Sequence, residues 1–98
     1  MKRLIWSGPA RSDLFSIAAY YGRIDPTLPD LILQRIEEAP LVLLDFPKVG
    51  SPTRNDRVRK WRVPKTPFVL FYAEHGDDIQ IRRVVHDRLE RLDGFMAP

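Results

Sequence analysis

The first half of the chain carries apolar residues at the spacing of an α-helix. Between residues 10 and 21 they recur every three or four positions, which predicts a helix with one apolar side. They are Leu14, Ile17, Ala18 and Tyr21. Ser7 can cap the start of this helix, Pro9 suits its first turn, and Gly22 is placed to end it.

A second helical pattern extends from about residue 28 to residue 44. Its apolar positions are Leu28, Leu31, Ile32, Ile36, Ala39 and Leu43. The helix can start at Asp25 or at Thr27, where Asp30 would complete a capping box. Pro40 cannot donate a hydrogen bond to the carbonyl of the preceding turn, so we expect a kink or break there and a last helical turn through about Leu44. Two helices joined by so short a turn should form an antiparallel hairpin.

The remainder of the chain has the composition of β-strands. A short strand is expected at the N-terminus and three more after residue 57, the middle one apolar on both faces. The four segments are Lys2–Trp6, Val58–Val63, Pro67–Glu74 and Ile79–Val85. Glu74–Asp78 predicts a hairpin turn, and residues 86–92 a terminal helical turn. The order β-α-α-β-β-β predicts an α+β fold in which an antiparallel sheet packs against an N-terminal helical hairpin.

Length and composition limit the number of domains and the location that we expect for the protein. The chain has 98 residues, no cysteine, a net charge of +3 and no apolar run long enough to span a bilayer. We therefore expect one domain over residues 1–93, a frayed tail at 94–98 and a cytoplasmic location. Phe15, Tyr20, Tyr21 and Phe71 are expected in the core, and His75 in an exposed turn.

Positive charge is concentrated between Arg54 and Lys65, a segment that contains six basic residues and one acid, Asp56. One interpretation is a solvated edge strand protected against pairing, and the other is a surface for an anionic target or an acidic protein. The residues expected to bind a target or partner are Arg57, Arg59, Lys60, Arg62 and Lys65, with Arg82, Arg83 and Arg88 in a second cluster. Trp61 alternates with Lys60 and Arg62, which favours an inward side chain over a base-stacking platform.

Four motifs in a fixed order resemble the RelE/ParE superfamily of bacterial type II toxin–antitoxin toxins, especially its ParE-like branch. A first strand leads into Ser7, Pro9, Ala10, Asp13 and Leu14, and a loop later ends in Phe46, Pro47 and Gly50. A basic strand then precedes Val63, Pro64 and Thr66–Leu70, and the chain closes on Asp78, Ile79, Ile81, Arg83, Val84 and His86. The resemblance covers about residues 2–88.

The resemblance implies a toxin that is neutralised by an acidic, partly disordered antitoxin, which binds the sheet and the C-terminal region. It also implies one of two targets. RelE-like members cleave mRNA on the ribosome, whereas characterised ParE-like members poison DNA gyrase. No cofactor or metal is expected, and the toxin–antitoxin pair should form a hetero-oligomer.

The residues that a metal-free nuclease would need are only partly present. Such an enzyme needs cations beside the phosphate together with a base and an acid. The nuclease set would be Lys60, Arg62, Arg83 and His86. Phe68 and Val69 stand where the RelE-like pattern has an arginine, and no tyrosine follows Tyr72. This favours a non-enzymatic toxin, and a structural or antitoxin-facing His86 over a catalytic one.

Three functions therefore stay open from the sequence. The first is a ParE-like toxin that inhibits gyrase, and the second is a RelE-like ribosome-dependent mRNA endoribonuclease. The third is a toxin fold that has lost toxicity and persists as an interaction module. Normal growth on expression without an antitoxin would indicate the third.

Overall fold

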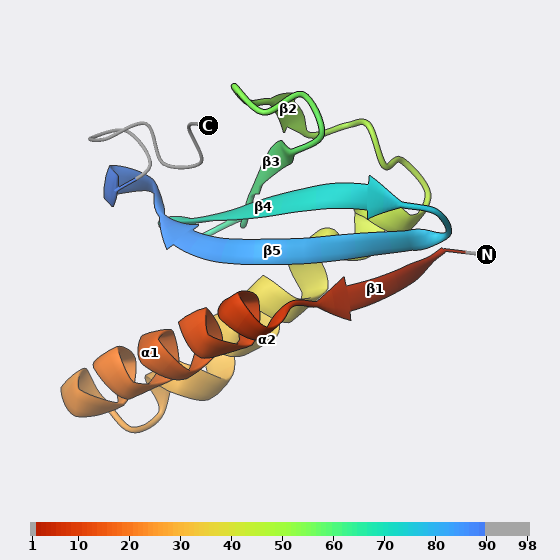
Figure 1. Ribbon diagram of the computed structural model, residues 1–98. Helices are drawn as coiled ribbons and strands as arrows, with labels where there is room; N and C mark the ends of the chain where they lie inside the picture. Colours follow the sequence, from red (N-terminus) through yellow and green to blue (C-terminus); the bar gives the residue numbers. More distant parts are fainter. Residues whose placement is uncertain (1, 90–98) are drawn as a thin grey trace.

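The computed structural model describes residues 2–89, and Figure 1 shows its sheet lying over a helical hairpin. The elements in chain order are β1 (Arg3–Trp6), α1 (Gly8–Ile24), α2 (Leu28–Glu38), the 3-10 helix η1 (Ala39–Leu44), β2 (Ser51–Pro52), β3 (Arg59–Arg62), β4 (Phe68–His75) and β5 (Asp78–His86). Residues 87–89 begin the predicted terminal helical turn. Its continuation to Leu92 and the predicted frayed tail at 94–98 lie outside the described residues. The predicted α+β order is confirmed, with the short strand β2 as an addition.

The five strands form one sheet in the order β1-β5-β4-β3-β2. The pairs formed by β3–β4 and β4–β5 are antiparallel, as predicted, and the additional strand β2 is antiparallel to β3. β1 instead runs parallel to β5, with Leu4 opposite Ile79 and Trp6 opposite Ile81. The prediction of an antiparallel sheet is therefore wrong at this edge. A parallel pair needs a long connection, and here the helical hairpin and three strands supply it.

The helix α1 begins where the sequence predicts and ends later. The hydroxyl of Ser7 accepts a hydrogen bond from the amide of Ala10 at 3.1 Å, which caps the helix. Gly22 lies inside the helix, so the predicted stop there is wrong. The helix ends at Asp25, whose carboxylate accepts hydrogen bonds from the amide and hydroxyl of Thr27, both at 2.8 Å. These bonds turn the chain toward α2 and lower the pKa of Asp25.

The second helix changes character at the predicted proline. α2 ends at Glu38, and the chain continues as η1, in which Pro40 occupies the first turn. Because Pro40 lies in the first turn of the 3-10 helix, its missing N–H leaves no hydrogen bond of the helix unmade. The predicted break and last turn are therefore confirmed. Thr27 precedes α2 but its side chain makes no capping bond to the helix, so the predicted capping box is absent. Its hydroxyl is bonded to Asp25 instead.

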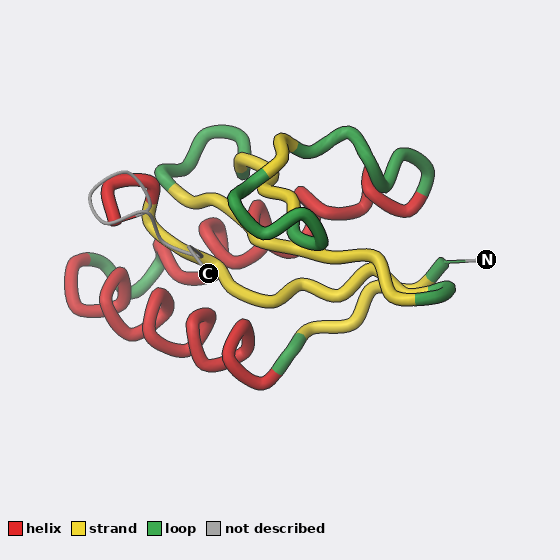
Figure 2. The backbone as a smooth tube through the Cα atoms, turned by 45° about the horizontal axis from the view of Figure 1, so that its top comes forward, coloured by secondary structure: helices red, strands yellow, loops and turns green. Residues whose placement is uncertain are grey.

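The core lies on both faces of β4, whose first six residues are buried. On the helical side, Leu70 and Tyr72 pack with residues that include Ile36 and Leu43. On the opposite side, a smaller cluster contains Val58, Val69, Phe71 and Val85. Figure 2 shows both helices on one side of the strands. The hairpin therefore covers one side of the sheet, and the smaller apolar cluster lies on the other side.

Two of the aromatic residues expected in the core are exposed. Phe15 is 79% exposed and Tyr20 is 54% exposed, because they lie on sides of α1 that do not face the sheet. Phe71 is fully buried, as predicted, and Tyr21 is half-buried. The ring of Tyr21 meets the edge of Phe68 with centroids 6.2 Å apart. The prediction thus holds for Tyr21 and Phe71 and is wrong for the other two.

A single tyrosine fastens the loop between η1 and β3 to the sheet. The hydroxyl of Tyr72 donates to the carbonyl of Pro47 at 2.8 Å and accepts from the amide of Gly50 at 3.0 Å. Burial raises the pKa of Tyr72, so the hydroxyl keeps its proton for the first of these bonds. A side chain at Gly50 would lie 2.5 Å from this hydroxyl and 2.8 Å from the carbonyl of Lys60. Glycine is therefore required for the loop to approach so closely.

Candidate functional site

The basic residues of β3 point alternately to the two faces of the sheet. Arg59 and Trp61 lie opposite Tyr72 and Leu70, on the helical side, whereas Lys60 and Arg62 share the other face. The indole of Trp61 donates to the carbonyl of Ala39 at 3.1 Å, which confirms the predicted inward orientation. The expected basic surface is therefore divided between two sides of the sheet.

Arg59 and Arg62 are both engaged within the protein. The Arg59 guanidinium donates to the carbonyl of Gly50 at 2.8 Å, so this arginine helps to hold the loop. Arg62 forms an ion pair of 2.8 Å with Asp87, just after β5. Asp87 also approaches His86, with Oδ1 and Nδ1 3.4 Å apart. The pair joins the end of β3 to the residue that follows β5, across β4, on the side away from the helices.

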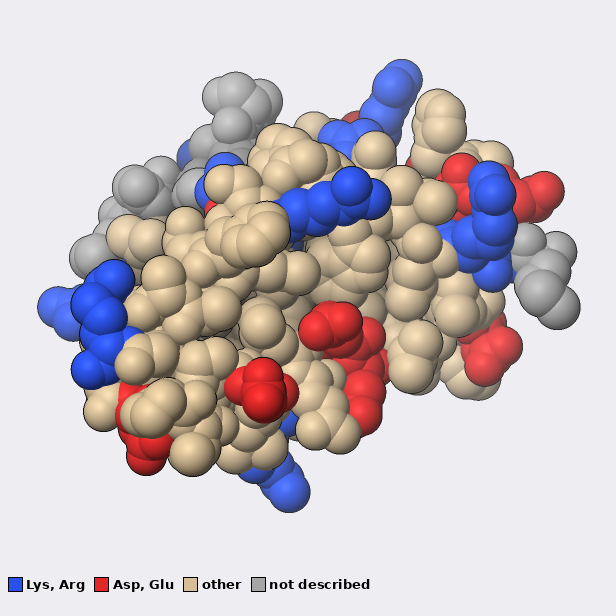
Figure 3. Space-filling view, turned by 90° about the horizontal axis from the view of Figure 1, so that it is seen from below, with Lys and Arg blue, Asp and Glu red and all other residues tan. Residues whose placement is uncertain are grey.

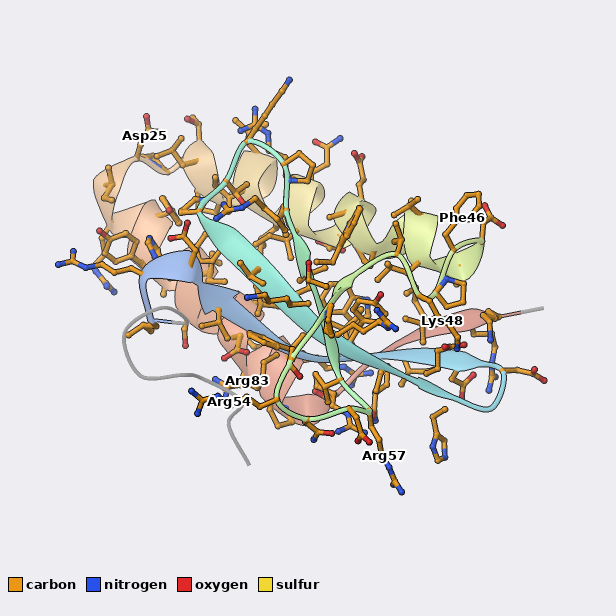
Figure 4. The ribbon with its side chains drawn as sticks, turned by 90° about the horizontal axis from the view of Figure 1, so that it is seen from above. Asp25, Phe46, Lys48, Arg54, Arg57 and Arg83 are labelled. Carbon is orange, nitrogen blue, oxygen red and sulfur yellow. The ribbon has the colours of Figure 1, made fainter. Side chains whose placement is uncertain are left out.

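Arg83 is a structural link between β5 and α1. Its guanidinium donates to both carboxylate oxygens of Asp13, at 2.8 and 2.9 Å, and Figure 4 shows it beside α1. Asp13 also accepts from the amide of Val84 at 2.8 Å. The hydroxyl of Ser7 donates to the carbonyl of Arg82. Ser7 and Asp13 thus pair backbone groups of β5 in the part of this strand that extends beyond β1. The hydrogen bonds to Asp13 raise the pKa of Arg83.

Arg62, Arg83 and His86, which belong to the possible nuclease set named above, each have a partner within the protein. Arg62 and Arg83 have different carboxylate partners, Asp87 and Asp13. The Nδ1 atom of His86 accepts a hydrogen bond from the amide of Arg88 at 3.1 Å, and its ring packs edge-on against Phe68. The next strand opens with Phe68 and Val69, which are 5% and 6% exposed. A phosphate bound near Lys60 would thus meet apolar side chains at the position where the nuclease pattern has an arginine.

The remaining predicted basic residues lie at the margins of the sheet. Arg57 is exposed in the loop before β3, and Arg88 is exposed after β5. Lys65 lies in the turn between β3 and β4 with a φ of 62°, and its carbonyl accepts from Arg35 at 3.3 Å. Arg82 is half-buried on β5, and its Nε donates to Gln80 at 3.2 Å. Arg57 and Arg82 line one cleft, and Lys65 and Arg88 lie outside its lining.

An apolar groove between α1 and the end of β5 was not predicted. It has a volume of about 350 Å³, and its apolar lining includes Ile17, Tyr20, Tyr21, Phe68 and Leu89. Tyr20 is half-exposed because it forms a wall of this groove. The signal in the sequence was the excess of apolar residues on α1, because Tyr20 and Tyr21 cannot both face the sheet. Asp13, Arg83 and His86 add polar groups along the rim.

On the helical side of the molecule, the charged side chains of the described residues are dispersed (Figure 3). Figure 3 shows Lys, Arg, Asp and Glu scattered over it among uncharged residues. Within residues 2–89, no three His, Cys, Asp or Glu side chains come together as a metal site would require. In the same residues, no helix is long and apolar enough to cross a membrane.

Comparison with known proteins places this fold among bacterial toxins. The profile of the ParE toxin of the type II toxin–antitoxin system parDE matches residues 4–90. A protein of Sinorhizobium fredii (strain NBRC 101917 / NGR234) named "Putative toxin Y4kP" is 29% identical over 85 residues, covering 87% of this chain and 88% of that protein. A chain in the structure of the chromosomal ParDE TA system from P. aeruginosa superposes with a TM-score of 0.77 at 26% identity. That match covers 88% of this chain and 96% of the other.

The protein is therefore a toxin of a type II toxin–antitoxin system. More narrowly, the chain belongs to the ParE toxin family. The predicted resemblance is confirmed, as is the predicted α+β fold. Membership in a parDE-type system gives the toxin an antitoxin as its partner.

Proposed function

We propose that this ParE-type toxin acts in the cytoplasm by inhibiting DNA gyrase without a catalytic site of its own. One observation supports this choice over mRNA cleavage: the strand after the basic strand opens with buried Phe68 and Val69 in place of an arginine. The ion pairs of Arg62 and Arg83 add to the argument, because each cation has a carboxylate partner within the protein.

The basic residues predicted to bind a target or partner divide into two groups in this proposal. Arg59 and Arg83 hold the loop and α1 in place, so part of their effect on binding comes from positioning neighbouring segments. We propose that the others contribute directly to recognition, and they are Arg57, Lys60, Arg62, Lys65, Arg82 and Arg88. Their positions around the sheet margins suit a partner that extends over several strands.

The apolar groove is the proposed anchor for the antitoxin. Stable protein interfaces bury aromatic and aliphatic side chains at their centre and surround them with polar groups. Tyr20, Tyr21 and Leu89 supply the apolar centre, and Arg83 and His86 supply polar groups around it. An antitoxin segment with apolar residues flanked by acids would fit this arrangement and form a hetero-oligomer.

A supercoiling assay tests the proposed target. Purified toxin, separated from its antitoxin, is added to gyrase and relaxed plasmid. We expect loss of supercoiling that rises with toxin concentration and is reversed by the antitoxin. Full supercoiling activity at saturating toxin, together with codon-dependent mRNA cleavage on ribosomes, would contradict the proposal.

A single variant separates the two mechanisms in cells. His86→Gln keeps a polar side chain but removes the group that a nuclease would use as acid or base. We expect induced His86→Gln toxin to stop growth as wild type does. Growth restored by this variant, with wild-type protein levels and antitoxin affinity, would indicate the nuclease instead.

A further inference from the structure

We propose that a polar cleft at the hairpin end of the sheet binds the phosphate groups of DNA. The cleft has a volume of about 450 Å³, and its charged lining includes Lys48, Arg57, Arg59, Glu74 and Arg82. It lies where β4 continues beyond β3, between the loop that follows η1 and the β4–β5 turn. The biological role of this DNA binding rests on the proposed action on gyrase, an enzyme that works on DNA. The binding itself does not depend on that proposal.

Four separate segments direct positive charge toward this cleft. Lys48 and Arg57 come from the two ends of the loop, Arg59 from β3 and Arg82 from β5. Figure 4 shows Lys48 beside the hairpin strands and Arg57 at the margin of the molecule, directed outward. The acids in the lining are Asp56 and Glu74, so cations are in excess. A concave surface with one predominant sign of charge concentrates its field and attracts a polyanion.

A β-bulge places Arg82 in this group. Phe71 pairs with Arg83 and Tyr72 pairs with Ile81, so Arg82 is an extra residue in β5. Bulges turn a side chain away from the direction that regular alternation would give it. The bulge here allows neighbouring arginines to serve different purposes. Arg83 is bonded to Asp13, and Arg82 lines the cleft.

The arginines of the cleft keep donors for an external ligand. A guanidinium has five N–H groups. Within the described residues, one N–H of Arg59 bonds to Gly50 and one of Arg82 bonds to Gln80, while the side chain of Arg57 has no hydrogen-bond or ion-pair partner. The carboxylate of Glu74 is already neutralised within the protein, because it lies 3.0 Å from the Nζ atom of Lys48 and 3.4 Å from that of Lys2. The free donors of the arginines therefore point to a phosphate, which accepts paired N–H groups.

The lining favours nucleic acid over a protein partner. Its apolar side chains are Pro47 and Ala73 together with the buried ring of Tyr72, which leaves little for a protein to pack against. Protein–DNA interfaces are more polar and more positively charged than protein–protein interfaces. The apolar groove at α1 has the opposite composition. Contacts limited to phosphates would give binding without sequence preference.

The test measures binding of the full-length toxin to a short fluorescent DNA duplex by anisotropy, over a series of NaCl concentrations. Each phosphate contact contributes about −0.9 to the slope of log K against log salt, so the three arginines of the cleft give a slope of roughly −3. In the double variant Arg57→Gln/Arg82→Gln the slope should be smaller in magnitude by about 2, with weaker binding to every duplex. The matched control is Arg11→Gln/Arg23→Gln, which removes the same charge from exposed positions on α1 and should keep the wild-type slope.

The single variant Arg57→Gln is a control for a folding defect in the double variant, because Arg57 is exposed in a loop and its replacement should not disturb folding. Its slope should change by about 1. Wild-type slope and affinity in both cleft variants would overturn the proposal. Loss of antitoxin affinity with unchanged DNA binding would also overturn it, because the cleft would then be a protein site.

A parallel supercoiling assay separates this proposal from the proposed target. Cleft-dependent DNA binding without gyrase inhibition would leave the cleft supported and refute the target. Gyrase inhibition by the toxin, together with normal DNA binding by its cleft variants, would support the target and refute the cleft.

Discussion

The polar cleft and the apolar groove arise in the same way at two margins of the sheet. In each, one strand continues past its neighbour: β5 extends beyond β1 at the groove, and β4 extends beyond β3 at the cleft. The segment that covers the open margin differs. The helix α1 brings tyrosines to the groove, whereas a loop with Lys48 and Arg57 borders the cleft. The covering segment, more than the strands, therefore decides what each site can bind.

The two sites are also fastened separately, which allows each to be damaged alone. Tyr72 and Gly50 hold the loop at the cleft. Asp13 holds α1 at the groove through Arg83 and Val84.

Gly50→Ala should be the most destabilising of four changes that test this separation. The added carbon would meet the hydroxyl of Tyr72 and the carbonyl of Lys60, and the latter belongs to the backbone and cannot rotate away. We expect a loss of about 3 kcal/mol or more in the free energy of unfolding, measured by urea denaturation. Gly8→Ala is the control, because nothing lies within 4 Å of its added carbon. Equal stability of the two variants would show that the loop is not held as described.

Asp13→Ala should weaken the groove and leave the cleft intact. It removes two bonds to Arg83 and one to the amide of Val84. We expect a loss of about 2–3 kcal/mol in unfolding free energy and weaker antitoxin binding, with unchanged affinity for DNA. Asp30→Ala, at an exposed position in the first turn of α2, should cost less than about 1 kcal/mol. Reduced DNA binding in the Asp13 variant would break the separation between the two sites.

Tyr72→Phe should cost about 1–2 kcal/mol near neutral pH, because the carbonyl of Pro47 and the amide of Gly50 lose their partner. Burial raises the pKa of Tyr72 above its ordinary value of 10.0. The unfolded chain therefore loses this proton first, and the stabilisation, complete below pH 10, is lost as pH rises through the folded pKa. Urea denaturation at about pH 8 and about pH 11 should show wild type losing more stability than Tyr72→Phe. An unchanged difference between the two proteins would contradict this assignment.

Glu74→Gln should have the smallest effect, below about 1 kcal/mol, because the ion pair with Lys48 is partly exposed. The hydrogen bond from Lys48 lowers the pKa of Glu74 from its ordinary value of 4.5. Its stabilisation is therefore present above pH 4.5 and is lost as pH falls through the folded pKa. Thermal unfolding of the two proteins should converge in acid. A difference that grows in acid would contradict the assignment.

The sequence predicted those features that depend on neighbouring residues. Ser7 caps α1 and Pro40 ends α2, because each acts through bonds within one turn. Gly22 failed as a stop because a glycine ends a helix only where the chain turns, and here the bonds of Asp25 to Thr27 make the turn.

Features that depend on distant contacts were beyond the sequence. Alternation along β1 indicates a strand but contains no information on its direction relative to β5. The bond from Arg83 to Asp13 joins residues 70 positions apart, so Arg83 was predicted to bind a partner although it fastens α1. Basic residues on β3 were likewise grouped by position in the chain, and their alternation divides them between two faces.

The parallel pairing of β1 with β5 also has a consequence for synthesis. β1 leaves the ribosome before the other described strands, and its neighbour in the sheet is the last of them. Contacts so distant in the chain form late in folding. The helical hairpin therefore emerges before any of the strands that complete the groove and the cleft. We expect a nascent chain released before β5 to be harmless, so that growth inhibition requires translation through β5.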